Sequence, residues 1–114
     1  MKISEIVKIL DGVLVAGEDQ MDREISFGFA SDLMSDVLTL ETNDLVLLTG
    51  LCNIQAIRTA EMSDIPCIIF VRRKKVTPEM IELAEESGIT LMECNYSMFK
   101  TVVTLAEHGI RPLF

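Results

Sequence analysis

Seven residues near the middle of the chain, from Asp44 to Gly50, read DLVLLTG. A continuous apolar run without polar alternation is typical of a strand that is buried on both faces of a parallel sheet. Two similar runs follow, CIIFV from Cys67 and TLMEC from Thr90. Counted from Leu45, the three strands start 22 and 23 residues apart. These intervals leave room for one crossover helix between each pair of parallel strands.

Amphipathic helix patterns fill these intervals and follow the third strand. Asn53, Thr77 and Ser97 stand where three helices begin, and all three residue types are favoured as N-caps. Gly88 and Gly109 stand where the second and third of these helices end. Alternating strands and helices predict an α/β fold with a parallel sheet covered by helices on both faces.

The first thirty residues add one short helix and two strands to this pattern. Apolar residues between positions 3 and 10 fall on one helix face, and the segments 13–16 and 24–30 have strand character. We therefore predict a single compact domain over residues 1–114, built on a parallel sheet of about five strands.

The overall charge of the chain limits its partners. The 114 residues carry a net charge of −8, which opposes binding to nucleic acid and to anionic membranes. No apolar run reaches the roughly 18 residues of a membrane span, and the N-terminal segment MKISEIVKIL carries charges that a signal peptide lacks. We expect a cytoplasmic protein without nucleic-acid or membrane partners.

The residues that usually carry catalysis and metal binding are scarce. The chain has three cysteines, Cys52, Cys67 and Cys94, none of them in Cys-x-x-Cys spacing, and one histidine, His108. A zinc or iron–sulfur site needs about four such ligands in one place, so we predict no metal and no cofactor. The chain has neither a P-loop nor a dinucleotide-binding fingerprint, and no persuasive Ser-His-Asp set. The sequence favours buried, reduced thiols at Cys67 and Cys94 and a protein without catalytic activity.

The ends of the predicted strands carry the polar residues that suit a ligand. In open parallel sheets, ligands bind beyond the carboxyl ends of the strands, where helix N-termini attract anions. The residues that we expect to contact a small anion there are Thr49, Gly50, Asn53, Arg72, Arg73 and Lys74. Alternatively, Asn53 is only a helix cap and the basic run Arg72–Lys75 is a solvated loop.

The segment FASDLMSDVL, residues 29–38, admits three interpretations. If residues 31–38 are helical, Asp32 and Asp36 share a helix face and could hold a divalent cation. In the second interpretation, Ser31 or Asp32 caps a short helix whose apolar residues pack inward. In the third, the segment forms an interface. The residues alone leave all three open.

This segment also resembles the signature of a known domain family. The run from Met21 to Leu38, MDREISFGFASDLMSDVL, resembles the signature of the DRTGG domain family, and the similarity extends over roughly residues 1–108, with a short tail at 109–114. The matching signature positions, which the resemblance marks as family or interface residues, are Asp22, Arg23, Gly28, Ser31, Asp32, Ser35 and Asp36. The Thr-Gly-Gly of the family appears here as Ser26-Phe27-Gly28, and a basic turn replaces a turn that is often glycine-rich.

The resemblance implies a regulatory or ligand-sensing module that forms homodimers. The family is similar to the N-terminal domain of HPr kinase/phosphorylase, occurs beside CBS domains, and has stand-alone copies associated with iron-only hydrogenases. The expected ligand is a small anionic metabolite or a nucleotide. The alternatives are an assembly module that dimerises through residues 31–38 without a ligand, and a carboxylate- or metal-dependent enzyme that uses Asp32, Asp36 and Asp22.

Overall fold

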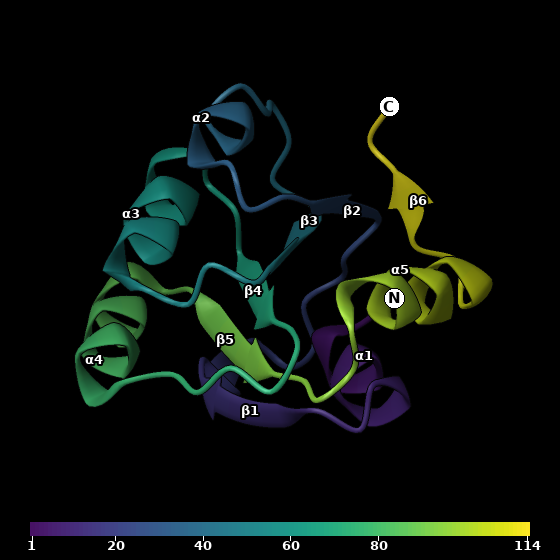
Figure 1. Cartoon of the computed structure of the whole chain (residues 1–114), viewed down its shortest axis with the longest axis horizontal. Coiled ribbons are helices and arrows are strands. Elements are labelled where there is room, and N and C mark those ends of the chain that lie inside the picture. The colour runs from purple at the N-terminus through teal and green to yellow at the C-terminus, as the bar shows by residue number, and fades with distance from the viewer.

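A six-stranded sheet runs through the centre of the molecule, with helices on both sides (Figure 1). The computed structural model describes all residues from Met1 to Phe114. In spatial order, the strands are β1 (Val13–Ala16), β5 (Thr90–Glu93), β4 (Cys67–Phe70), β3 (Leu45–Thr49), β2 (Phe27–Ala30) and β6 (Arg111–Pro112). All neighbouring strands are parallel except β1, which runs antiparallel to β5.

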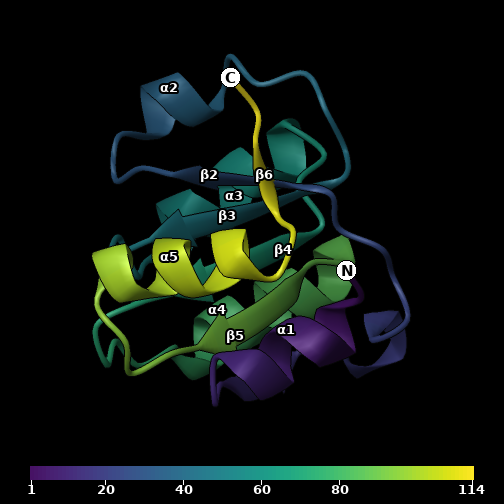
Figure 2. The ribbon, with the colours of Figure 1, turned by 90° about the vertical axis from the view of Figure 1, so that its right-hand side faces the viewer.

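The helices form one layer on each face of the sheet. On one side lie α2 (Met34–Val37), α3 (Ile54–Met62) and α4 (Pro78–Ser87), and on the other lie α1 (Ile3–Ile9) and α5 (Met98–Glu107) (Figures 1 and 2). A short 3₁₀ helix, η1 (Glu18–Gln20), follows β1. The sheet faces pack into two cores of 16 and 13 buried residues. Two cores of similar size explain why β3 and β4 are buried at every position.

The α/β fold with helices on both faces is therefore confirmed. The predicted helix starts are also those observed, since the side chain of each predicted cap accepts a backbone hydrogen bond. Asn53 accepts from Ala56 N–H at 3.1 Å, and Thr77 and Ser97 cap α4 and α5 in the same way. Because these side chains satisfy free N–H groups, they fix where α3, α4 and α5 begin.

The structure differs from the prediction at four places. The second strand is shorter than residues 24–30, the sixth strand was not predicted, and β1 does not share the parallel direction. Residues 31–38 do not form one helix, because α2 contains four residues and starts after Leu33, which makes no side-chain cap. Ser31 and Asp32 therefore do not cap it. Instead, Ser31 Oγ accepts a hydrogen bond from Leu33 N–H at 3.0 Å, in a turn ahead of α2.

The last residues of the chain complete one edge of the sheet. Arg111 and Pro112 pair with Phe27 and Gly28, so β6 covers the outer edge of β2. A Cβ atom added to Gly28 would lie 3.1 Å from a methyl carbon of Ile110. The small residue at position 28 thus lets the chain after α5 pack closely on β2. None of the helices is both long enough and apolar enough to cross a membrane.

Candidate ligand-binding edge of the sheet

The register of three parallel strands brings the predicted strand-end residues to one edge of the sheet. Ala30 pairs with Leu48 and Thr49 pairs with Phe70, so β2, β3 and β4 end side by side. Backbone hydrogen bonds continue the pairing beyond the strands, from Ser31 N–H to Leu48 O at 3.0 Å and from Val71 N–H to Thr49 O at 3.1 Å. We call this side of the sheet the carboxyl edge.

Asp32 lies at the carboxyl edge, directly on the residues that follow β3. Its Oδ1 accepts hydrogen bonds from Gly50 N–H at 2.7 Å and from the hydroxyl of buried Thr49 at 3.0 Å. A Cβ atom added to Gly50 would lie 3.5 Å from both carboxylate oxygens. The Thr49 hydroxyl oxygen also accepts from Leu51 N–H at 3.1 Å. Asp32 thus already binds two groups that were expected to contact a ligand.

The basic turn, Arg72–Lys75, follows β4 at the same edge. All four side chains are exposed. Arg72 and Arg73 both have φ of 62°, a left-handed conformation that is uncommon for residues other than glycine. Their N–H groups donate to Tyr96 O at 2.8 Å and to Cys94 O at 3.1 Å. These bonds hold the backbone of the turn against the loop after β5, while its charged side chains stay in solvent.

Glu93, at the end of β5, neutralises one end of the basic turn. Its Oε2 accepts from Val76 N–H at 2.8 Å, and its Oε1 lies 3.6 Å from Lys75 Nζ. Arg72, Arg73 and Lys74 take part in no ion pair. Glu93 had no predicted role, although an acidic residue at the end of the neighbouring strand was a usable signal. At the carboxyl edge, Lys75 is thus paired with Glu93, while the other three cations of the basic turn are unpaired.

Cys52 connects the loop after β3 to the basic turn. Its Sγ donates a hydrogen bond to Lys75 O at 3.3 Å. Burial raises the pKa of the Cys52 thiol, and the nearby Glu93 carboxylate raises it further, against a smaller opposing effect of Lys74. The thiol therefore stays protonated near neutral pH and can donate this bond. This arrangement suits a structural side chain, because a nucleophilic cysteine needs a lowered pKa.

The family-signature residues do not gather at one place. Ser31 and Asp32 lie at the carboxyl edge, whereas Asp22 and Arg23 precede β2. Arg23 is half-buried, donates to Asn43 O at 2.9 Å, and lines a polar hollow of about 370 Å³. Its Nε is buried without a hydrogen-bond partner.

Ser35 and Asp36 are exposed on α2. Asp32 lies outside this helix, so Asp32 and Asp36 do not share a helix face, and the predicted geometry for a cation on residues 31–38 was wrong. No group of three or more His, Cys, Asp or Glu side chains in the chain could hold a metal ion.

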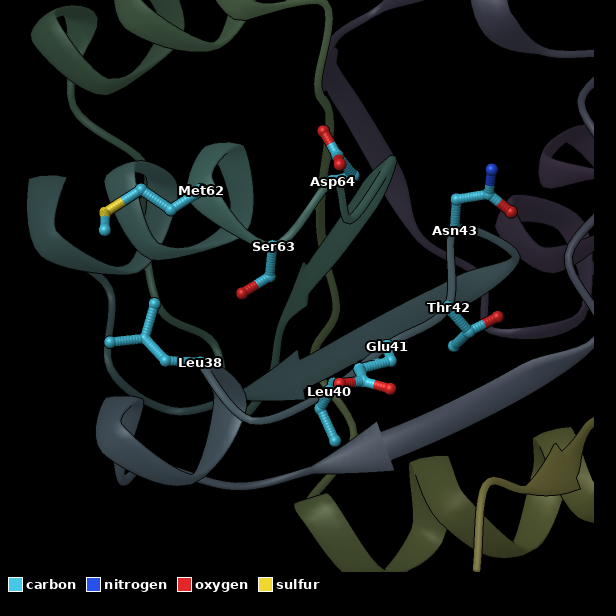
Figure 3. Close-up of a pocket in the computed structure, with 8 residues that line it drawn as sticks. All are labelled: Leu38, Leu40, Glu41, Thr42, Asn43, Met62, Ser63 and Asp64. Carbon is cyan, nitrogen blue, oxygen red and sulfur yellow. The ribbon is translucent and has the colours of Figure 1, made fainter.

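A second hollow lies next to the one beside Arg23, because Asn43 and Asp64 line both. Figure 3 shows an open groove of about 730 Å³ between the end of α3 and the segment that leads into β3. Its lining residues are Leu38, Leu40, Glu41, Thr42, Asn43, Met62, Ser63 and Asp64. The groove contains two carboxylates and no basic side chain, so it is poorly suited to an anion.

The comparison with protein families matches the DRTGG domain over residues 5–108. The chain belongs to the DRTGG domain family. The comparison with curated proteins found no match for this DRTGG domain.

A solved structure shares the fold. It is the crystal structure of the CBS and DRTGG domains of the regulatory region of Clostridium perfringens pyrophosphatase, complexed with its activator, diadenosine tetraphosphate. The TM-score is 0.73 at 10% sequence identity, over 98% of this chain and 51% of that one. This DRTGG domain therefore spans about half the length of its structural relative.

Proposed function

We propose that this DRTGG domain is a non-catalytic regulatory module of the cytoplasm that binds a polyphosphate or nucleotide at the carboxyl edge. The observation that carries the proposal is the basic turn. In a protein of net charge −8, three adjacent cations have no ion pair and extend from a backbone that is fixed by hydrogen bonds. Two consecutive left-handed residues raise the energy of this turn, and such strain is concentrated at functional sites.

The neighbouring groups are consistent with a phosphate ligand. Thr49, Gly50 and Asn53 lie on the adjacent loop, and the N-terminus of α3 adds a partial positive charge. The structural relative binds diadenosine tetraphosphate in a regulatory region that includes a DRTGG domain. Nucleotides with several phosphates are therefore the first ligands to test.

Isothermal titration calorimetry with pyrophosphate, ATP and diadenosine tetraphosphate tests this function. We expect the double variant Arg72→Asn/Arg73→Asn to bind at least about tenfold more weakly, because two charge-assisted contacts are lost. Asparagine tolerates the left-handed conformation, so the turn keeps its shape. The control Lys8→Gln/Arg58→Gln removes two exposed charges elsewhere and should keep wild-type affinity. No binding, or an equal loss in the control, would refute the proposal.

A second candidate function is self-association through residues 31–38. Leu33 and Leu38, in this segment, are 58% and 48% exposed. Met62 of α3 is 72% exposed, and Figure 3 places its side chain on the same side of the groove as Leu38. Apolar side chains gathered on one surface favour a protein interface. Assembly is compatible with ligand binding, because the exposed apolar residues Leu33, Leu38 and Met62 differ from the residues of the basic turn.

Sedimentation velocity tests this assembly. We expect a homodimer at tens of micromolar, roughly the range for interfaces of standard size, and a shift towards monomer in Leu33→Ser/Leu38→Ser. Val13→Ser is the control, because Val13 is 55% exposed but lies on β1. A wild-type monomer at every concentration would exclude the dimer.

The family resemblance also implies an association with iron-only hydrogenase systems, which co-purification with such a hydrogenase would test.

A further inference from the structure

Asp32 occupies the place that an anion would take at the carboxyl edge. A ligand oxyanion at this edge would accept hydrogen bonds from the Thr49 hydroxyl and Gly50 N–H, because Thr49 ends β3 and Gly50 follows it directly. In the structure, both donate to Asp32 Oδ1, at 2.7 and 3.0 Å. Asp32 is therefore an oxyanion supplied by the chain itself, held on the donors of the proposed site.

We propose that Asp32 determines the specificity of this site by competing with anionic ligands, so that only anions with several charges displace it. This inference rests on the proposed function, since it assumes that the ligand binds at the carboxyl edge. It assigns Asp32 a role that the other contacts do not explain, because the carboxylate neither caps α2 nor forms an ion pair.

The selectivity follows from comparing the binding free energy of a single phosphate group with that of a polyphosphate. An anion with one phosphate group that replaces Asp32 exchanges two hydrogen bonds for two similar ones. It also lies beside the displaced carboxylate, and repulsion between like charges at about 4 Å is worth roughly 1–4 kcal/mol near a protein surface. A single phosphate group therefore gains little binding free energy when it replaces Asp32 on these two donors.

A polyphosphate gains additional contacts on the next strand. β3 and β4 are hydrogen-bonded neighbours, and adjacent strands lie about 4.8 Å apart. Thr49 pairs with Phe70, so Gly50 lies opposite Val71, and Arg72 is the next residue. A second phosphate group can therefore reach the three unpaired cations while the first binds Gly50. These charge-assisted contacts offset the repulsion from Asp32.

Displacing Asp32 requires little rearrangement. Asp32 and Leu33 are both exposed, and the first buried side chain after them is Met34, in α2. The Ser31–Leu33 turn that positions Asp32 is held by one hydroxyl, because Ser31 Oγ accepts from Leu33 N–H at 3.0 Å and donates to Leu33 O at 3.5 Å. The carboxylate can consequently leave the two donors, and stay beside them, while the core contacts of α2 remain.

Calorimetric titrations of Asp32→Asn with inorganic phosphate and pyrophosphate test this inference. The amide oxygen of asparagine can accept the same two hydrogen bonds, so the variant removes the charge and keeps the fold. We expect wild type to prefer pyrophosphate strongly. In the variant, phosphate affinity should rise about tenfold, which corresponds to about 1.4 kcal/mol, while pyrophosphate affinity rises less. Asp36→Asn, the same charge change on exposed α2, should leave both affinities unchanged.

Nuclear magnetic resonance of wild type gives a readout that needs no variant. The Gly50 amide signal should move when pyrophosphate is added and stay in place with inorganic phosphate at the same concentration. Pyrophosphate binding with unchanged selectivity in Asp32→Asn and an unmoved Gly50 signal would overturn this inference and leave the proposed function intact. Absence of pyrophosphate binding to both proteins would refute both.

Discussion

Cys67 shows how burial alone changes the chemistry of one side chain. It begins β4 in the middle of the sheet and is fully buried. Desolvation raises the pKa of the Cys67 thiol from 9.0 to about 12, because a thiolate would lack water at this position. The sequence analysis expected buried thiols at Cys67 and Cys94, and both are buried.

This raised pKa predicts how stability depends on alkaline pH. The unfolded thiol loses its proton above about pH 9, whereas the folded thiol keeps it to about pH 12. Stability from this group is therefore complete below pH 9 and is lost as the pH rises from 9 to 12, by about 1.4 kcal/mol per unit. Urea unfolding of wild type and Cys67→Val at several pH values measures the difference. Parallel curves for the two proteins would contradict the assigned cause.

Asp32 is the residue whose role could not be predicted from local sequence. Its contact with Gly50 depends on β2 lying next to β3 in a fixed register, and these strands are separated along the chain by α2 and its flanking loops. Local rules favour an aspartate in this context as a helix cap. Asp32 contacts the end of β3 and does not cap a helix, because at β3 one carboxylate oxygen accepts two hydrogen bonds at once.

Among the elements, those with strong periodicity were predicted best. β3, β4, β5 and the helices α3 to α5 lie where the apolar runs and cap residues indicate. In contrast, α2 has four residues and β6 has two, and such short segments show no measurable periodicity. Their positions are set by packing against the sheet, which is known only after the longer elements are in place.

The start of α3 allows the capping and ligand roles of Asn53 to be separated. Asn53→Ala should lower the free energy of unfolding by about 1 kcal/mol, because the bond to Ala56 N–H is lost. Asn53→Asp keeps this bond and should keep stability. If an anion contacts this position, the added charge should weaken pyrophosphate binding. Urea unfolding and calorimetry measure the two effects. Gln55→Ala, exposed in the same helix, is the control. Unchanged affinity in Asn53→Asp would leave Asn53 with the capping role alone.

On the scale of the whole molecule, the two outer edges of the sheet are closed in different ways. β1 closes one edge by running antiparallel to β5, while β6 closes the other with two residues that include a proline. Leu113 packs against the core on the side of α2 to α4, and Phe114 makes an edge-to-face contact with Phe29 at 6.0 Å between ring centroids. The last four residues therefore contribute to the fold.

Deleting residues 111–114 tests this contribution. The deletion exposes the hydrogen-bonding groups of β2 and removes the contacts of Leu113 and Phe114. We expect a lower melting temperature and a greater tendency to aggregate, because an unpaired strand can pair with another chain. Thermal unfolding and light scattering measure both. Phe114→Ser, which removes only the aromatic contact, should have the smaller effect. A deletion variant that is as stable and as dispersed as wild type would show that β6 is dispensable.

The pairing of β2 with β6 also has a consequence for biosynthesis. The ribosome makes β2 before β3, β4 and β5, whereas Arg111 and Pro112, which cover the outer edge of β2, are made after all three. A nascent chain that has completed β3 to β5 therefore still presents one uncovered strand. Translation that pauses late would prolong this stage, and chaperone contact with the nascent chain would be most valuable at that time.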